Sequence, residues 1–251
     1  MYLQSNGLPI NPQTWNYTKV DDEYKNRDNR MNNQLMVPGQ TYWGTNGGRI
    51  DWSGDAAEIA NASHRNFMPQ TGTGYFPHKW CSERDGVPTG MEAYDFPVIR
   101  YAEVLLNRAE AAYELTQLGK TTSEDGDSYR DEAFRCINLI RERAGADLLA
   151  SAADLNSVDI VRRERRKELA FENQTYWDLR RWRIFYDEQN TTRYRILMPF
   201  FATDVNKYFF DVRFTEPRAG YNYIFTYDTR YYYQPLPSGE LTKNPNLKNN
   251  P

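Results

Sequence analysis

The stretch VRRERRKELAFENQTYWDLRRW, residues 161–182, decides the fold because it combines a dense set of charges with large aromatic side chains. It allows three interpretations: a nucleic-acid grip, a set of catalytic carboxylates, or a buried structural element. Glu164, Glu168 and Glu172 recur every four residues, so on a helix they form an acidic stripe that repels phosphate and pairs with the neighbouring arginines. The structural interpretation is favoured, since no nucleophile, histidine or metal ligand accompanies the carboxylates.

The aromatic side chains of this stretch support the same interpretation. Trp177 and Trp182 lie among arginines, and an indole stacks well on a guanidinium group. We therefore predict that both indoles are structural. Ion pairs and Trp–Arg stacking would hold a helix, which spans residues 157–172 and is capped by Asn156 or Ser157, and a short following helix that ends at Trp182.

Two longer helices precede this stretch. Residues 98–118 carry polar side chains at spacings of three and four, from Arg100 to Gln117, and are otherwise mostly apolar. This pattern predicts a helix with one solvent-facing polar stripe that is buried on most of its circumference. Residues 128–144 predict a second helix, which Gly145 ends. Together they form a helical hairpin whose apolar surface needs neighbours, as in a helical repeat.

The rest of the chain shows less periodicity. Residues 1–96 are rich in Gly, Pro, Asn and aromatic residues and predict long loops. In the C-terminal part, aromatic residues alternate over 221–227 and predict one short, half-buried strand. Regularity otherwise fades from Tyr186 onwards. The Pro- and Asn-rich end, residues 234–251, is expected to lie extended over the surface.

Composition excludes several classes of protein. The net charge is -3 over 251 residues, so the chain as a whole is not built to coat nucleic acid. His64 and His78 are the only histidines, which leaves little for a zinc site or a Ser-His-Asp triad, and we expect no metal and no cofactor. Cys81 and Cys136 are interpreted as free or buried thiols, although one disulfide bond remains open.

The sequence carries no sign of a membrane span or a secretion signal. No stretch approaches the roughly 20 consecutive apolar residues that a transmembrane helix needs. The opening, MYLQSNGLPINP, lacks the basic segment and apolar run of a signal peptide. It is interpreted as the beginning of the chain in the middle of a loop.

Five blocks, in this order, resemble the signature of the SusD/RagB family. They are NRDNRMNNQLMVPG at 26–39, YDFPVIRYAEVLLNRAEAAYEL at 94–115, INLIRERAGA at 137–146, RRERRKELAFENQTYWDLRRW at 162–182 and YYYQPLPSGELTKNPNLKNNP at 231–251. The first block departs from the family pattern at Asn29, where proline is usual. Because the blocks extend over nearly the whole chain, the resemblance is specific although no single block would suffice.

The resemblance implies a surface-exposed outer-membrane lipoprotein of Bacteroidetes that binds a nutrient, usually a glycan, without catalysis and caps a TonB-dependent transporter. It implies a mainly α fold, in which tetratricopeptide-like helix pairs support a large loop-rich ligand-binding region with a few short strands. The chain would be the C-terminal part of a single SusD-like domain. Its expected parts are the ligand-binding loops at 1–96, the helical signature region at 97–183 and an irregular region at 184–251.

The resemblance also indicates what the chain lacks. The helix pairs of the family's N-terminal half have no counterpart here, and neither has the lipidated cysteine, because Cys81 and Cys136 are internal. Membrane attachment is therefore expected only through an N-terminal lipid that is absent from this chain.

Sugar binding needs flat aromatic faces with amide, carboxylate or guanidinium groups beside them. The loop-rich region supplies both, and the candidate ligand-binding residues are Tyr42, Trp43, Asn46, Arg49, Trp52 and Tyr75. Tyr42 and Trp43 are favoured because a Gly-rich turn presents side chains without burying them. The alternative for any one tryptophan is a small core packed under the loops. The tyrosines at 221–233 are a rival surface, for which a half-buried strand is the favoured interpretation.

Alternative functions remain open at this point. The chain could belong to an oligopeptide-binding or protein-binding member of the same family, or it could be a tetratricopeptide-type scaffold for protein interactions. A glycoside hydrolase would also use aromatic residues and carboxylates, but no pair of acids is marked by its spacing. We expect a binding protein and not an enzyme, with an oligosaccharide or polysaccharide as its ligand and no nucleic-acid partner.

Overall fold

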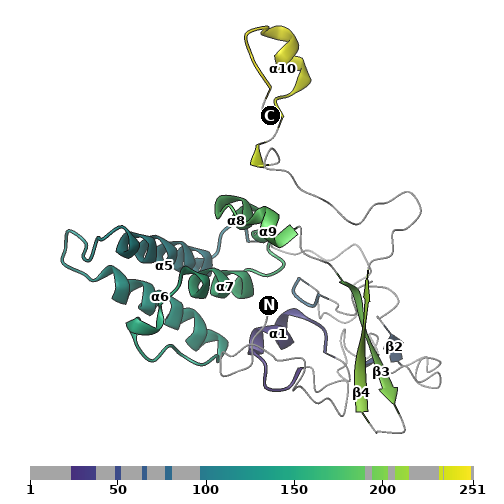
Figure 1. The fold of residues 1–251 in the computed structure, drawn as a ribbon. Helices are drawn as coiled ribbons and strands as arrows, with labels where there is room; N and C mark the ends of the chain where they lie inside the picture. Colours follow the sequence, from purple (N-terminus) through teal and green to yellow (C-terminus); the bar gives the residue numbers. More distant parts are fainter. Residues whose placement is uncertain are drawn as a thin grey trace.

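The computed structural model describes residues 24–37, 49–51, 64–66, 77–80, 97–189, 194–202, 207–214, 232–233 and 235–249, with the backbone alone in the strands and at 188–189. The helices of this part are α1 (Asn29–Gln34), α5 (Tyr101–Gln117), α6 (Tyr129–Ala144), α7 (Val158–Glu168), α8 (Thr175–Arg181), α9 (Phe185–Gln189) and α10 (Ser238–Lys243). The strands are β1 (Arg49–Asp51), β2 (His64–Asn66), β3 (Tyr194–Ala202) and β4 (Lys207–Phe214). Helices thus dominate the described part, and the predicted mainly α fold is confirmed. Figure 1 shows α5, α6 and α7 lying together, with the β3–β4 hairpin on the other side of α1.

The predicted helical hairpin is α5 and α6, and its helix ends follow from local chemistry. Ser128 caps α6, since its side chain accepts a hydrogen bond from the backbone N–H of Asp131 at 3.2 Å. Gly145 ends α6 in the left-handed conformation, with φ 63°. Gly119, just after α5, has φ 76°. Both predicted helices are therefore confirmed to within a few residues of their ends.

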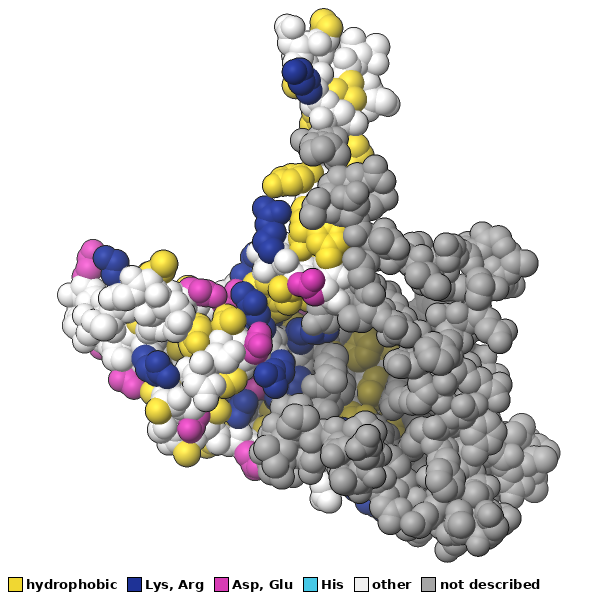
Figure 2. Space-filling model, viewed as in Figure 1, with side chains coloured by type: hydrophobic (Ala, Val, Ile, Leu, Met, Phe, Trp, Pro, Cys, Tyr) yellow, Lys and Arg dark blue, Asp and Glu magenta, His cyan; other side chains and the backbone are white. Residues whose placement is uncertain are grey.

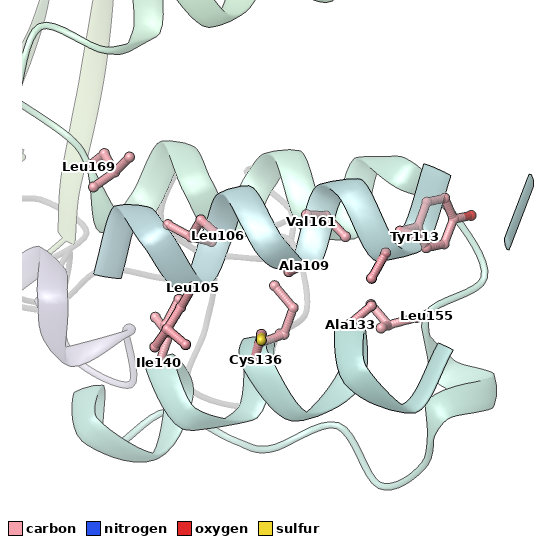
Figure 3. Packing of buried hydrophobic residues seen from close by; sticks show 12 residues of the cluster. Leu105, Leu106, Ala109, Tyr113, Ala133, Cys136, Ile140, Leu155, Val161 and Leu169 are labelled. Atoms are coloured by element: carbon pink, nitrogen blue, oxygen red, sulfur yellow. The ribbon is translucent and has the colours of Figure 1, made fainter. Parts of the chain in front are cut away.

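The hairpin is held together by a core in which small and large side chains alternate (Figure 3). Ala109 and Ala133 are fully buried and allow the two helices to approach closely. Leu106 and Ile137 are also fully buried, and each contributes about 1.5–3 kcal/mol by leaving water. Val161 of α7 joins the same core, so the third helix supplies the neighbour that the hairpin needs.

The solvent-facing polar stripe expected on α5 is only partly present. Glu110 has 7% of its surface exposed because it pairs with Arg181. In its place, Tyr101 and Val104 are exposed at 71% and 47%. The prediction was wrong at these positions because spacing identifies a face but cannot say that an acid on it meets an arginine from another helix.

The charged stretch forms α7, a tight turn and α8. Ser157 caps α7, because its side chain accepts a hydrogen bond from the backbone N–H of Asp159 at 3.2 Å. The helix ends at Glu168, four residues earlier than predicted. The chain then turns through Phe171 and Asn173, whose φ angles of 64° and 59° lie in the left-handed region. The short helix that follows is confirmed as α8.

The four strands of the described part were not predicted from the sequence pattern. β3 and β4 form an antiparallel pair with Leu197 opposite Val212 and Phe200 opposite Phe209. β1 and β2 form a short parallel pair with Ile50 opposite Arg65. The strand that was predicted over 221–227 lies outside the described residues.

The C-terminal segment differs from the expectation of an extended chain. It contains α10, none of whose residues is buried, and Figure 1 shows this helix projecting away from the helical part. The segment closes on itself through a hydrogen bond of 2.9 Å from the backbone N–H of Leu236 to the side-chain oxygen of Asn249. Across the described residues, α10 included, no helix is long and apolar enough to cross a lipid bilayer.

Candidate ligand-binding site and its support

The predicted ligand-binding residues all fall within one stretch of chain whose two ends meet. Leu35 and Pro77 form an isolated antiparallel bridge. The backbone carbonyl of Gln34 accepts hydrogen bonds from the N–H groups of His78 at 2.8 Å and of Lys79 at 3.3 Å. The two ends of the stretch 38–76 therefore meet at one place. We call this stretch the closed loop.

The first limb of the closed loop is fixed by a buried arginine. Arg30 contacts Asp28 at 2.6 Å, and its other contacts reach α7, with Glu164 at 2.7 Å and Glu168 at 3.2 Å. The side-chain amide of Gln34 donates to the carbonyl of Lys167 at 3.1 Å. Hydrogen bonds between ionised groups are shorter and stronger than neutral ones, so they define how this limb sits on α7.

The second limb is fixed to the turn after α7. The ammonium group of Lys79 donates to the carbonyl oxygens of Glu168 at 3.2 Å and Ala170 at 3.0 Å, and it forms an ion pair with Glu172. The indole N–H of Trp80 donates to the carbonyl of Phe171 at 2.9 Å. These donors satisfy carbonyl groups that the end of a helix leaves without partners.

The contacts of both limbs belong to one network, which we call the charged core. Its members are Asp28, Arg30, Lys79, Arg100, Arg141, Arg143, Glu164, Lys167, Glu168 and Glu172. Glu164 is fully buried and contacts three cations. Arg100 joins α5 to the network through Glu168 at 2.6 Å and Glu172 at 2.7 Å. The structural interpretation of residues 161–182 is thus confirmed for the carboxylates of the stretch.

The electrostatics of the charged core favour the ionised forms of Asp28 and Glu164. Burial opposes ionisation of Asp28, but the hydrogen bonds and charge of Arg30 and the charge of Lys167 outweigh burial and lower the pKa to about 2. The pKa of Glu164 is lowered in the same way, since the charges of Lys167, Arg30 and Arg141 outweigh the effect of burial. Acids held in this state are poor proton donors, and this arrangement suits a support better than acid catalysis.

A second set of ion pairs joins α5 to α7 and α8. Glu110 accepts hydrogen bonds from Arg181 at 2.5 Å and from the indole N–H of Trp182 at 2.7 Å. Arg165 donates to Asp178 at 2.6 Å. Two guanidinium groups lie over the ring of Trp182, with the carbon of Arg162 at 5.1 Å and that of Arg181 at 5.3 Å from the ring centroid. The structural role predicted for Trp182 is confirmed.

A cleft of about 340 Å³ opens beside this second set of ion pairs. It is lined by Asn107, Glu110, Ala111, Glu114 and Arg181. Because Glu110 and Arg181 neutralise each other, the cleft offers few polar groups that are free to bind a ligand. Among the residues that the structure describes, no group of His, Cys, Asp and Glu side chains could hold a metal ion.

The structure tests none of the six candidate ligand-binding residues. Tyr42, Trp43, Asn46, Trp52 and Tyr75 lie outside the described residues, and Arg49 lies in β1, where the backbone alone is described. Of the two cysteines, Cys136 is a free and buried thiol, as expected, and Cys81 lies outside the described residues. The prediction that Trp177 is structural is wrong, since 57% of the surface of this residue is exposed.

Sequence reasoning missed the residues that anchor the closed loop. Arg30 and Gln34 lie in the block at 26–39 that resembles the family, so they were within view but had no assigned role. Trp80 was seen only as one of the aromatic residues suited to sugar binding. Nothing in the sequence indicated that Lys79 and Trp80 anchor the loop, because their partners lie about ninety residues further along the chain. Only the folded chain brings these pairs together.

Comparisons with known proteins agree with the resemblance and with this architecture. Residues 1–251 match the profile of the SusD family. A SusD-like protein from Bacteroides fragilis is 24% identical and has a TM-score of 0.64, with 99% of this chain and 44% of that chain covered. A SusD-like carbohydrate binding protein from the same organism is 24% identical and has a TM-score of 0.62, with 98% and 46% covered. No curated protein sequence matches the chain. The chain thus spans less than half the length of these two solved structures.

Proposed function

The chain belongs to the SusD family, and on this premise we propose that it is the ligand-binding part of a protein that captures a glycan or another nutrient without changing it chemically. The ligand would then pass to a TonB-dependent transporter in the outer membrane, with the protein exposed at the cell surface. Within this proposal, residues 1–96 carry the ligand, and residues 97–183 support them.

The observation that carries the proposal is the closure of residues 38–76 on the charged core. All six candidate residues, from Tyr42 to Tyr75, lie between Leu35 and Pro77, which pair with each other. A loop that is fixed at both ends loses less conformational freedom when it binds a ligand than a free segment does. Preorganisation of this kind supports the capture of a ligand by aromatic residues, and such capture requires no chemical step.

The states of the buried acids support a role without catalysis. Glu168 has a lowered pKa because, although burial raises it, Arg143 and Arg100 outweigh burial. Its oxygens contact three arginines, so it is neither a proton donor nor free to attack a sugar. Release of reducing sugar from soluble glycans by the purified protein would contradict this part of the proposal.

The proposal is tested by affinity electrophoresis of the full-length protein in gels that contain soluble polysaccharides. We expect at least one polysaccharide to retard the protein, and Trp43→Ala and Tyr42→Ala to reduce the retardation. The matched control is Tyr101→Ala, which removes an aromatic ring that is 71% exposed on α5. Normal retardation of both loop variants would refute the assignment of these residues, and no retardation by any glycan would refute the ligand class.

The partner and the nature of the cargo need separate experiments. Co-purification of a TonB-dependent transporter with the tagged protein from outer membranes tests delivery. Competition between oligopeptides and oligosaccharides for the same protein distinguishes the oligopeptide-binding alternative. If peptides bind and Trp43→Ala weakens them while glycans do not bind, the closed loop carries peptides.

A further inference from the structure

A continuous row of aromatic rings runs from α8 to residues 232–233. Neighbouring ring centroids lie 5.0 Å apart for Trp177 and Tyr176, 5.5 Å for Tyr176 and Phe185, 6.2 Å for Phe185 and Tyr186, and 4.6 Å for Tyr186 and Tyr232. Each pair meets edge to face, the arrangement that the charge distribution of aromatic rings favours. Because Phe185 in the middle of the row is buried, the row packs α8 and α9 against residues 232–233 and leaves exposed rings at its ends.

Two arginines lie on this aromatic row, and they differ in how their donors are used. Arg180 donates to the hydroxyl of Tyr176 at 2.8 Å and to the carbonyl of Tyr232. Arg183 lies over the rings of Tyr232 and Tyr233, with its guanidinium carbon 4.9 Å and 5.6 Å from their centroids. Throughout the described part of the chain, the Arg183 guanidinium has no hydrogen bond and no acidic partner.

The two ends of the aromatic row are open to solvent. Trp177 at one end is 57% exposed, and Tyr233, beside Arg183 at the other end, is 51% exposed. Figure 2 shows hydrophobic side chains next to those of Lys or Arg where the C-terminal segment leaves the helical part. An indole with most of its surface in water forgoes the large gain from burial, so this surface is poorly explained by packing alone.

We propose that this surface binds an acidic saccharide, with sugar rings stacked on Trp177 and Tyr233 and a sugar carboxylate paired with Arg183. The guanidinium group presents parallel N–H donors that match a carboxylate, and stacking on the tyrosines fixes its plane. A uronic acid unit offers an apolar ring face and a carboxylate on one ring. Arg183 and Tyr233 offer their complements within 5.6 Å of each other.

This site is separate from the closed loop and can be tested independently of it. The probe is polygalacturonic acid, and its neutral counterpart is the same polymer with its carboxylates methyl-esterified. Titration calorimetry with the full-length protein should show tighter binding of the acid form. Because a carboxylate–guanidinium pair is a strong, geometrically specific contact, we expect Arg183→Gln to weaken binding of the acid by about tenfold and to leave the ester unaffected.

Three further variants separate this site from general electrostatic attraction. Arg183→Lys keeps the charge but loses the paired donors, so its affinity should lie between those of wild type and Arg183→Gln. Trp177→Ala should weaken the binding of the acid form and of the ester alike. The control is Arg163→Gln, at an exposed arginine on α7, which should leave both affinities unchanged.

Three outcomes would overturn the inference. They are wild-type affinity of Arg183→Gln for the acid, an equal loss in Arg163→Gln, or no preference of the wild type for the acid over the ester. Loss of binding in Trp43→Ala but not in Arg183→Gln would also overturn it, while leaving the closed loop as the ligand site. If an acidic protein and no acidic glycan bound at Arg183, the surface would be a protein interface and the saccharide assignment would be wrong.

Discussion

Replacement of Glu164 by glutamine removes the central acid of the charged core without changing its size. The carboxylate contacts Arg30 at 2.7 Å, Arg141 at 2.9 Å and Lys167 at 3.2 Å, and its side chain is fully buried. Glutamine can accept a hydrogen bond through its oxygen, but its NH₂ group would point at cationic donors. The variant therefore leaves buried positive charges without their partner.

The magnitude follows from the cost of unpaired buried charge. Removal of one partner from a buried ion pair costs about 3–5 kcal/mol, because the remaining charge is uncompensated and cannot reach water. Glu168 is still in contact with Arg30 at 3.2 Å, and this contact offsets part of the loss. We expect Glu164→Gln to lower the free energy of unfolding by about 3 kcal/mol.

The assay is urea unfolding at neutral pH, followed by far-ultraviolet circular dichroism. The matched control is Glu142→Gln, the same substitution at an exposed position of α6, which should change the free energy of unfolding by less than about 0.5 kcal/mol. The double variant Arg30→Met/Glu164→Met should recover part of the stability, since it removes charges of both signs together. Equal stability of Glu164→Gln and Glu142→Gln would refute the role assigned to the charged core.

The remaining predictions concern pH, backbone conformation and thiol reactivity. Asp28 has its pKa lowered from 3.8 to about 2, so its contribution of about 2 kcal/mol should be present above about pH 5 and be lost as the pH falls towards 2; denaturant midpoints across this range measure it, and Asp28→Asn should flatten the profile. Gly145→Ala should destabilise by about 1–2 kcal/mol, since φ is 63° and the new Cβ would lie 2.9 Å from the side-chain nitrogen of Asn29; unchanged stability would contradict the close approach. In a Cys81→Ser background, Cys136 should react with a disulfide reagent only as fast as the protein unfolds, because burial, with Glu132 adding to it, raises the pKa of its thiol to about 11; immediate reaction would contradict this placement.

The helices could be predicted from the sequence because their signals are local. Ser128 and Gly145 mark the ends of α6, and each acts on backbone groups within a few residues of itself. The hairpin core also follows from spacing, as the burial of Ile137 and Ile140 shows. The early end of α7 could not be predicted in this way. Its signal is the left-handed conformation of Phe171, which a bulky residue adopts only where the surrounding contacts impose it.

The partners of the charged core could not be predicted, because charge pattern gives the number of acids and bases but not their pairing. Glu164, Glu168 and Glu172 were expected to pair with arginines of the same stretch. In the structure, Lys167 of the same stretch contacts Glu164, but most of the cations come from other segments, such as Arg30 and Lys79. Pairings over a hundred residues depend on topology, and local periodicity is silent on topology.

Trp177 and the β3–β4 hairpin show two further limits of pattern reasoning. Trp177 and Trp182 belong to the same charged stretch, but they sit five residues apart on and just after α8, so they face different directions. Trp182 is buried, whereas Trp177 is 57% exposed. In β3, apolar residues occur in a run without strict alternation, and such a run does not distinguish a strand from a buried helix segment.

An apolar join between the closed loop and α7 would bury similar surface, so the use of paired charges needs a physical reason. Apolar contacts tolerate sliding, whereas the hydrogen bonds from Arg30 to Asp28 and Glu168 depend on direction and restrict the position of the first limb. Lys79 imposes the same condition on the second limb through two backbone carbonyls. The double variant Arg30→Met/Glu164→Met separates stability from position, since it removes the directional contacts and keeps apolar burial. If the double variant unfolds like wild type but binds glycan more weakly, the charged core acts by placing the closed loop, because lost stability would not account for the weaker binding.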